Sequence, residues 1–421
     1  MTPSTADLLA HSRALILDLQ DDGGAYPASP TFSAYRGYCW LRDGSFIADA
    51  MSAIGEIDSA SRFFDWCAAT IERYQDRITA IVAAAESGAP LPDEAMLPTR
   101  FTFSGGLGTA SWEDFQLDGY GTWLWALAEH ARRHGLDLDR WSSAISATTA
   151  YLASSWMRPC YDWWEEHDER VHVSTLGCVS VGLRAGISSG ALDDDLANRA
   201  GAAIQAIEAL VARRGIHQGH LVKWLDADTA DGSLSALLSP LGFIDARSSV
   251  GLATIKAVET ELCVDGGVYR FRADTFFGGG RWPLLSCFLG LAELAAGDRP
   301  TAQHLLDWAL STAAVNGDLP EQVDGGSLLS PEHRQAWIDR WGPVAQPLLW
   351  SHAMVLRLAQ ALADAAPTAD EGGAGSGAGD NSNECVPAEH LATSDTPIGQ
   401  TADDQASGAN TSDEHQGGGD Q

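Results

Sequence analysis

Lysine is almost absent from this chain of 421 residues, in which Lys223 and Lys256 are the only two lysines. Its 26 basic residues face 57 acidic ones, and the formal net charge is −31. This balance argues against a nucleic-acid partner, because a phosphate backbone requires a basic patch on the protein. An acid-rich, lysine-poor composition also fits a salt-adapted protein, although GC-rich coding favours arginine over lysine in the same way.

The sequence has no CxxC motif and no long apolar run. Its seven cysteines are scattered and odd in number, which favours a reducing cytoplasm and argues against structural zinc. The first twenty residues lack a basic segment and show helical spacing of apolar residues, so they predict an amphipathic helix and no secretion signal. No segment approaches the roughly 18 consecutive apolar residues of a membrane span. We therefore expect a cytoplasmic protein without a membrane, metal or cofactor requirement.

The composition changes near Pro367. Residues 367–421 contain no Lys, Arg or aromatic residue and are rich in Gly, Ser, Asp, Asn and Gln. Such a segment cannot bury enough apolar surface to fold, so it predicts a disordered acidic tail. Residues 1–366 are then the predicted catalytic domain. The composition leaves open whether the tail only keeps the protein soluble or binds a partner, and it does not indicate the oligomeric state.

Residues 1–366 show a succession of helical patterns and almost no alternating strand pattern. Helices are predicted at 4–20, 43–56, 58–86, 119–134, 138–157, 171–188, 190–214, 247–262, 282–296, 300–315 and 346–365. Short and long connections alternate between them, as in stacked helical hairpins. The long connections, rich in Gly and Trp, are 21–42, 98–118, 158–170, 263–281 and 316–345. In a closed ring of hairpins these connections would gather at one end and line a pocket.

The stretch CYDWWEEH, residues 160–167, places two glutamates directly after two tryptophans. Neighbouring side chains on an extended segment point in opposite directions, so Glu165 and Glu166 are predicted to have different roles. Indole next to Glu165 would desolvate its carboxyl group and raise its pKa, as a general acid requires. The alternative is an exposed polar turn that closes a hydrophobic run.

Other long connections also combine charged and aromatic residues. Arg42 next to Asp43 offers donors and an acceptor that suit adjacent sugar hydroxyls, although Asp43 could simply cap a helix. Asp118 precedes a helix and has the same two interpretations. Glu321 lies in the loop DLPEQVD, where no helical pairing explains it. The chain has 15 tryptophans, many of them beside Gly or charged residues, and aromatic faces beside carboxylates favour a sugar as the ligand.

A near-motif for calcium precedes Gly232. Asp226, Asp228 and Asp231 resemble the start of a calcium-binding loop, but their spacing is off by one residue. No glutamate follows at the position that the loop requires. Calcium is therefore not expected here.

Taken together, these segments resemble glycoside hydrolase family 15, which contains glucoamylases, glucodextranases and trehalases. The resemblance runs in order over residues 30–360. Its motifs are W-x-R-D at Trp40–Asp43, W-x-x-x-Q-x-D-G at Trp112–Gly119, D-x-W-E-E at Asp162–Glu166, R-x-x-x-D-T at Arg270–Thr275, a Gly-rich turn into Trp282, E-Q at Glu321 and W-S-H at Trp350. Each motif is weak alone, but their shared order is specific.

The resemblance implies an all-α fold, an (α/α)6 barrel, and exo-acting hydrolysis with inversion at the anomeric carbon. Glu165 would be the general acid and Glu321 the general base that activates water. Glu166 would bind the leaving sugar. The other residues that the resemblance implies in substrate binding are Trp40, Arg42, Asp43, Trp112, Asp118, Trp164, Arg270 and Trp282. Gln322, next to Glu321, could orient the base.

The resemblance leaves the substrate linkage open. The chain shows neither the N-terminal β-sandwich of many prokaryotic members nor a starch-binding module, which favours small soluble α-1,4-linked maltodextrins over granular starch. The turn at 278–281 and the residues before Trp40 differ from the fungal pattern. Trehalose or an α-1,6-linked glucoside is the nearest alternative. A phosphorolytic enzyme would not need Glu321, and a sugar-binding protein without activity would be expected to lack one of the two carboxylates.

Overall fold

The computed structural model describes residues 4–109, 112 and 115–365, all of which lie within one compact unit, Met1–Gly379. The described α-helices are α1 (Thr5–Leu19), α2 (Leu41–Ala53), α3 (Ile57–Arg73), α4 (Gln75–Glu86), α5 (Asp118–His134), α6 (Ser142–Ser155), α7 (Val173–Ser188), α8 (Asp194–Arg214), α9 (Leu234–Leu238), α10 (Ser249–Leu262), α11 (Pro283–Ala296), α12 (Arg299–Ser311), α13 (Arg334–Trp341) and α14 (Leu349–Asp364). The predicted acidic tail lies outside the described residues.

Six of the described helices form a closed inner ring. Following the chain, α2 packs on α5, α5 on α7, α7 on α9, α9 on α11, α11 on α14, and α14 returns to α2. These helices are buried on nearly all sides, in contrast to the half-buried pattern of a surface helix. Where α5 meets α7, a Cβ on Gly121 would lie 2.2 Å from the carbonyl oxygen of Cys178. Glycine is therefore required for the close approach of these two backbones.

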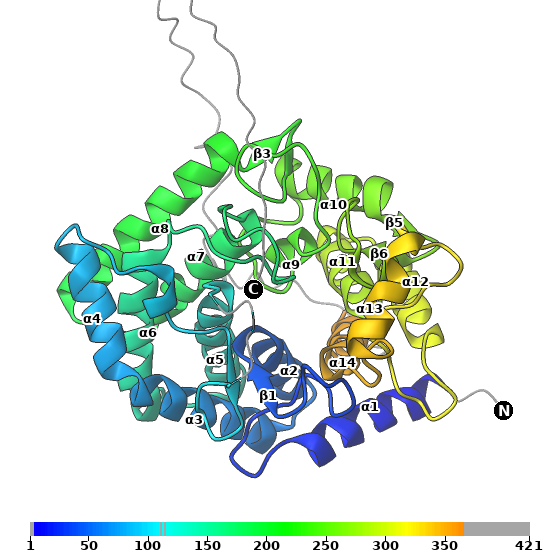
Figure 1. Ribbon diagram of the computed structural model, residues 1–421, viewed down its shortest axis with the longest axis horizontal. Coiled ribbons are helices and arrows are strands. Elements are labelled where there is room, and N and C mark those ends of the chain that lie inside the picture. The colour runs from blue at the N-terminus through cyan, green and yellow to red at the C-terminus, as the bar shows by residue number, and fades with distance from the viewer. Residues whose placement is uncertain (1–3, 110–111, 113–114, 366–421) are drawn as a thin grey trace, which may run out of the picture. The chain divides into compact units, whose positions relative to one another are not determined.

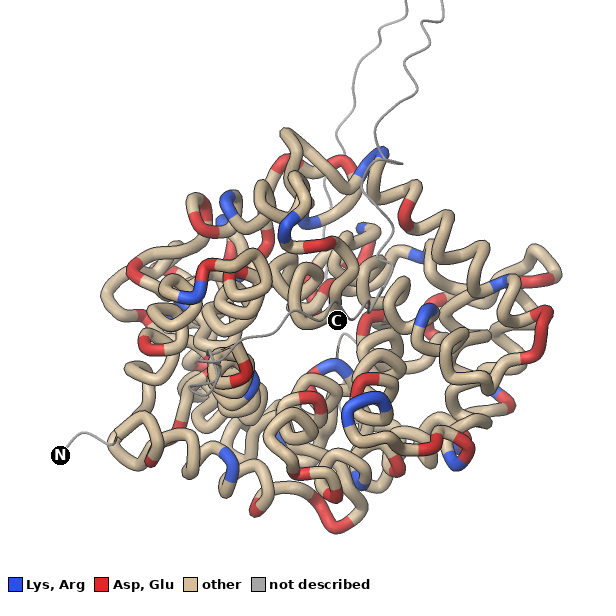
Figure 2. The backbone as a smooth tube through the Cα atoms, turned by 180° about the vertical axis from the view of Figure 1, so that it is seen from behind, with Lys and Arg blue, Asp and Glu red and all other residues tan. Residues whose placement is uncertain are grey.

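The outer layer consists of α1, α3, α6, α8, α10 and α12, which pack around the inner ring in Figure 1. Five of the inner helices pack on the outer helix that follows them in the chain, for example α7 on α8 and α11 on α12, and the last inner helix, α14, packs on α1 and α12. The alternation of outer and inner helices confirms the predicted (α/α)6 barrel. Asp and Glu are spread over the outer helices in Figure 2, with fewer Lys and Arg among them. No helix among the described residues has the length and apolar character needed to cross a membrane.

The observed helices differ from the sequence prediction at three places. The helix predicted over 58–86 is two helices, α3 and α4, which meet at Tyr74, the residue between them. The short inner helix α9 was missed because five residues give too little periodicity and Pro240 follows soon after. The helix α13 was also missed, because it lies within a connection rich in polar residues. The other predicted helices are present within a few residues of their expected ends.

Short strands fasten the long connections near the inner helices. In the first pair, β1 (Tyr38–Trp40) is antiparallel to β2 (Arg100–Thr102), with Trp40 opposite Arg100. A three-stranded sheet contains β5 (Cys263–Val264), β6 (Gly267–Tyr269) and β7 (Arg281–Trp282), and Tyr269 lies opposite Arg281. The remaining pair is β3 (Ile216–His217) and β4 (His220–Leu221). These strands were not predicted, because two or three residues are too few for an alternating pattern to be recognised.

Candidate active site

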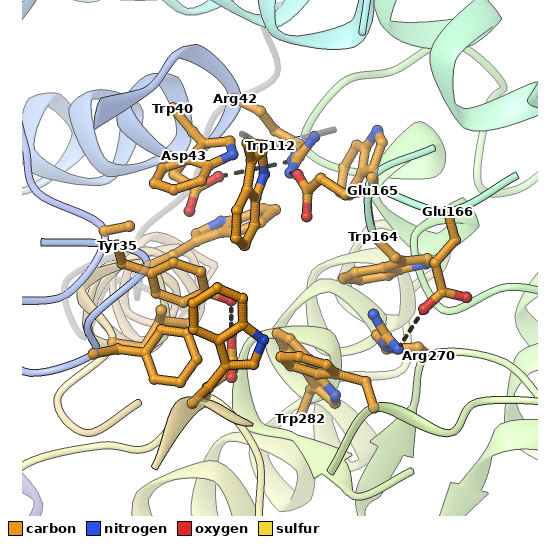
Figure 3. Close-up of a pocket in the computed structure, with 18 of the residues that line it drawn as sticks. Tyr35, Trp40, Arg42, Asp43, Trp112, Trp164, Glu165, Glu166, Arg270 and Trp282 are labelled. Carbon is orange, nitrogen blue, oxygen red and sulfur yellow. Dashed lines mark hydrogen bonds and ion pairs between the residues drawn. The ribbon is translucent and has the colours of Figure 1, made fainter. Parts of the chain in front are cut away.

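A cavity of about 250 Å³ is lined by residues from all five of the long connections. This confirms the prediction that these connections gather and line one pocket. Figure 3 shows aromatic and charged side chains converging on it from several elements. The lining residues include Trp40, Arg42, Asp43, Trp112, Trp164, Glu165, Glu166, Arg270, Trp282 and Glu321. Every predicted site residue except Asp118 therefore lines the same cavity.

Arg42 connects three of the long connections. It lies in the first turn of α2, and its guanidinium is buried. Nη1 donates to Oε1 of Gln116 and to Oδ2 of Asp118, each over 2.9 Å. Nη2 donates to Oε1 of Glu165 over 3.0 Å. Asp118 is fully buried, and the structure differs here from the predicted sugar contact: Asp118 binds Arg42 and does not line the cavity.

Asp43 presents a carboxyl group to the cavity next to Arg42. Its Oδ2 lies 3.7 Å from Nε of Arg42, and both atoms are buried without a hydrogen-bond partner among the described residues. Burial raises the pKa of Asp43 to about 6, and the charge of Arg42 opposes this increase. An unpaired donor and an unpaired acceptor at the cavity wall match the donor and acceptor capacity of sugar hydroxyls.

Glu165 and Glu166 point in different directions, as predicted, but the cause is a tight turn and not an extended segment. Glu165 has a φ of 58°, in the left-handed region that non-glycine residues rarely adopt. Its carboxyl group faces Arg42, whereas Oε1 of Glu166 accepts a hydrogen bond from Nη2 of Arg270 over 3.0 Å. Figure 3 shows the two side chains diverging from neighbouring positions. A strained residue held at a cavity wall is typical of a functional site.

The pKa of Glu165 is raised to about 7. Burial is the main cause, and Arg42 and Gln116 oppose it by stabilising the ionised carboxylate. A carboxyl group with this pKa is partly protonated at neutral pH, which general acid catalysis requires.

Glu321 is 2% exposed and lies in the connection between α12 and α13. The hydroxyl of Tyr35 donates to its Oε1 over 2.8 Å, and its Oε2 is buried without a hydrogen-bond partner among the described residues. Burial raises the pKa of Glu321 to about 8, while Tyr35 and Arg270 lower it and the charge of Glu165 raises it. A buried carboxyl oxygen without a partner at a cavity wall is placed to accept a proton from water.

Gln322 does not orient Glu321, contrary to the sequence hypothesis. Its side-chain oxygen accepts from the backbone of Gly280 over 2.7 Å, and its amide donates to the carbonyl oxygen of Phe276 over 3.1 Å. Gln322 therefore fastens the glycine-rich turn to the neighbouring loop. The residue that contacts Glu321 is Tyr35, which the aromatic spacing before Trp40 could have suggested.

The W-S-H motif at the start of α14 holds the backbone just before Glu321. Ser351 donates to the carbonyl oxygen of Pro320 over 2.8 Å, and Nε2 of His352 accepts from the backbone N–H of Leu319 over 2.9 Å. Burial, with a smaller contribution from His11, lowers the pKa of His352 to about 3, so the ring is neutral. Its Nδ1 then carries the proton and donates to Ser12 on α1 over 2.8 Å.

Aromatic side chains make the walls between these charged groups. The rings of Trp40 and Trp112 lie 5.9 Å apart, and those of Trp164 and Trp282 lie 5.5 Å apart. The indole nitrogens of Trp112 and Trp282 are buried and have no hydrogen-bond partner among the described residues. Aromatic faces with free N–H groups at their edges suit a ligand with apolar C–H faces and many hydroxyls.

Several lining residues were not predicted. These are Ala28, Phe32, Tyr35, Trp163, Phe276, Trp337, Arg340, Trp341, Leu348 and Trp350. Three of them lie on or next to the unpredicted α13, so the missed helix also concealed part of the cavity wall. Phe32, Tyr35, Trp163 and Phe276 lie in predicted long connections, so the aromatic residues of these connections were the signal that could have found them.

Comparisons with known proteins agree with this geometry. The family model described as Glycosyl hydrolases family 15 matches residues 7–316. The isomaltose glucohydrolase of Kribbella flavida is 50% identical over 366 residues, which cover 87% of this chain and 95% of that protein. Trehalase 2 of Sulfolobus acidocaldarius is 25% identical over 327 residues, covering 72% of this chain and 56% of that protein.

Solved structures resemble this chain in fold. A glycosidase variant in complex with glucose superposes with a TM-score of 0.82 at 50% identity, covering 85% of this chain and 96% of that chain. A bacterial glucoamylase in complex with acarbose superposes with a TM-score of 0.65 at 20% identity, covering 85% of this chain and 55% of that chain, and indicates a shared fold. The family match over most of the chain, together with the 50% identity to the isomaltose glucohydrolase, places the protein among the glycoside hydrolases. The chain belongs to glycosyl hydrolase family 15.

Proposed function

We propose that this protein is an inverting, exo-acting α-glucosidase that releases β-D-glucose from the non-reducing end of small α-1,6-linked glucosides such as isomaltose. The observation that carries the proposal is the 50% identity, over nearly the whole of both chains, to an isomaltose glucohydrolase. The sequence expectation of an α-1,4-linked maltodextrin has no comparable support. The trehalases are related at about half this identity.

The size of the cavity supports a short substrate. Its volume of about 250 Å³ is smaller than that of most ligand sites, which typically enclose roughly 300–1,000 Å³. Trp337, Arg340 and Trp341 of α13 add a further wall to it. A chain end of one or two sugar units fits such a space better than an internal segment of a polymer.

In the proposed reaction, Glu165 donates its proton to the glycosidic oxygen as the bond to the anomeric carbon breaks. Glu321 accepts a proton from a water molecule that attacks the anomeric carbon from the opposite face. Glucose leaves in the β configuration, and the second sugar leaves with a free hydroxyl. Inverting glycosidases use one protonated and one ionised carboxyl group in this way, about 6.5–9.5 Å apart.

Arg42, Asp43, Arg270 and the tryptophan walls would hold the terminal glucose. Arg42 Nε and Asp43 Oδ2 have no hydrogen-bond partner among the described residues, which supports a contact with neighbouring sugar hydroxyls. Glu166, held by Arg270, would contact the leaving sugar.

The pKa of Glu321, about 8, is higher than that of Glu165, about 7, whereas the proposed roles need the proton on Glu165. Substrate binding supplies a physical reason for the proton to move. Sugar hydroxyls at Arg42 would compete for the N–H groups that now stabilise ionised Glu165, and this would raise the pKa of Glu165. A protonated Glu165 in turn no longer raises the pKa of Glu321, so Glu321 ionises more readily.

The test is proton NMR of the purified protein with isomaltose, maltotriose and trehalose in separate tubes, following the anomeric signals from the first minutes. We expect β-glucose to appear first, and fastest from isomaltose. α-Glucose as the first product would contradict the water mechanism with two carboxyl groups. Faster release of glucose from maltotriose would show a preference for the α-1,4 linkage, and faster release from trehalose would identify trehalose as the preferred substrate. Binding without release of glucose would indicate a sugar-binding protein.

A further inference from the structure

Lys223, one of the two lysines of the chain, is buried in the barrel although it does not line the cavity. It follows β4, and its side chain is 3% exposed. The other lysine, Lys256, lies on α10 with its side chain 75% exposed. A buried ammonium group is costly unless carboxylates pair with it, so the partners of Lys223 define what it does.

The ammonium group of Lys223 lies between two buried aspartates. Nζ donates to Oδ2 of Asp162 over 2.7 Å and to Oδ2 of Asp231 over 2.6 Å. It also lies 3.9 Å from the centre of the Phe271 ring. Burial alone would lower the pKa of Lys223, but the two carboxylates outweigh burial and raise it, so the group stays charged. The carboxylate of Asp231, which belongs to the near-motif for calcium, is thus paired with the ammonium group of Lys223.

Asp162 folds the turn that carries the proposed acid. Its Oδ1 accepts from the backbone N–H of Trp164 over 2.9 Å and from that of Glu166 over 3.0 Å, one on each side of Glu165. The backbone N–H of Asp162 donates to the carbonyl oxygen of Glu166 over 2.9 Å and closes the turn. The left-handed φ of Glu165 costs on the order of 1–3 kcal/mol, so the turn persists only if these contacts hold it.

Asp231 fixes the tryptophan that lies next to Glu165. The indole N–H of Trp164 donates to Oδ2 of Asp231 over 3.0 Å. Oδ1 of Asp231 accepts from the backbone N–H of Ser233 over 2.9 Å and from its hydroxyl over 2.6 Å. Lys223 therefore joins the aspartate that shapes the acid turn to the aspartate that orients an indole of the cavity wall.

We propose that Lys223 is a positioning residue for proton donation by Glu165. It acts on Glu165 through its contacts with Asp162 and Asp231. This inference rests on the proposed function of Glu165. Lys223 touches neither the cavity nor the substrate. It neutralises and spaces the two aspartates, so that the turn keeps the carboxyl group of Glu165 aimed at the glycosidic oxygen.

The experiment compares two substrates that differ in their need for an acid. Cleavage of isomaltose needs protonation of the leaving oxygen, whereas α-D-glucosyl fluoride loses fluoride with little help from an acid. For Lys223→Met we expect kcat on isomaltose to fall by about 10²-fold, the scale of positioned acid catalysis, with KM changed less than about three-fold. On α-D-glucosyl fluoride we expect a loss of less than ten-fold. Lys256→Met is the matched control and should retain the wild-type rates.

An equal loss on both substrates would show that Lys223 only maintains the fold, and unchanged rates would show that it does not position Glu165; either result overturns the proposal. Asp231→Asn gives a second route if Lys223→Met does not fold, because it removes one charge and keeps an acceptor for Trp164. It should show a smaller loss with the same dependence on the substrate.

A crystal structure of the variant separates this inference from the proposed function. If Lys223 is a positioning residue, the turn at 162–166 should be displaced in Lys223→Met while the inner helices keep their places. An undisturbed turn would overturn the inference, whatever the substrate. If the wild-type protein does not hydrolyse isomaltose, the proposed function fails, and the crystal structure still decides the role of Lys223.

Discussion

The hydroxyl of Tyr35 donates to Oε1 of Glu321 over 2.8 Å, so a residue of the first long connection holds the carboxyl group of the fifth. The hydrogen bond stabilises the ionised carboxylate and lowers the pKa of Glu321, against the larger opposite effect of burial. Tyr35 therefore keeps the pKa of the proposed base lower than burial alone would make it.

Tyr35→Phe removes only the hydroxyl and should raise the pKa of Glu321 further. At a pH below the pKa of Glu321, each unit by which this pKa rises lowers the ionised fraction of the base about ten-fold. We therefore expect the acidic limb of the plot of kcat/KM against pH to move to higher pH, while the alkaline limb moves less. The measurement is kcat/KM on isomaltose between pH 5 and 9. An acidic limb that stays in place would show that Tyr35 does not control the base.

Glu321→Gln should fold and lose activity by about 10²–10⁴-fold, because no base remains to activate water. It should also change the pH dependence of stability. The pKa of Glu321 is about 8 in the folded protein and 4.5 ordinarily, so between these values the folded state binds more protons than the unfolded state. The wild-type protein then loses stability as the pH rises through this window.

Glutamine cannot ionise, so the variant avoids this loss. We expect the Tm of Glu321→Gln to match that of the wild type at pH 5 and to exceed it by about 2–5 °C at pH 8, measured by calorimetry. A variant that is equally destabilised at both pH values would argue against a raised pKa for Glu321.

Glu165→Gln keeps the size and the hydrogen-bond acceptor of the side chain but cannot donate the proton of an acid. Hydrolysis of isomaltose should fall by about 10²–10⁴-fold, with a much smaller loss on α-D-glucosyl fluoride, whose leaving group needs little protonation. Steady-state rates on the two substrates give the comparison. Equal losses on both would assign Glu165 a role other than the acid.

His352→Ala should destabilise the loop before Glu321. The substitution removes the acceptor for the N–H of Leu319 and the contact with Ser12, and it leaves a buried polar group without a partner. We expect a loss of about 2–4 kcal/mol in the free energy of unfolding, measured with urea. His333→Ala, at an exposed histidine, is the control and should change stability little. Equal stability of the two variants would contradict the role of His352.

A protein truncated after residue 366 tests the proposed domain boundary. The cavity-lining side chains identified among the described residues all belong to residues up to 365, so we expect kcat and KM on isomaltose to stay within about two-fold of those of the full chain. A large loss would show that residues 367–421 contribute to the fold or to the site.

The salt-adaptation hypothesis concerns the net charge of −31. At low salt the repulsion between carboxylates is weakly screened. A salt-adapted protein should therefore have a lower Tm when salt is withdrawn. An unchanged Tm between low and high salt would attribute the low lysine content to coding bias.

Much of the molecule could be read from the sequence because its determinants are local. Helical periodicity, glycine at helix ends and aromatic residues in the long connections predicted the ring of hairpins and the five segments that line the cavity. The neighbouring glutamates, Glu165 and Glu166, follow from a motif of five residues. Each of these features depends on residues close together in the chain, where spacing alone carries the information.

The contacts that tune the site depend on residues far apart in the chain, and only the tertiary structure decided them. Asp118 binds Arg42 and not the cavity, Tyr35 replaces Gln322 as the partner of Glu321, and Lys223 joins Asp162 to Asp231. Ring closure brings these side chains together and buries most of them. The raised pKa values of the two proposed catalytic carboxyl groups result mainly from that burial. No spacing in the sequence determines how deeply a carboxyl group is buried or which donor reaches it.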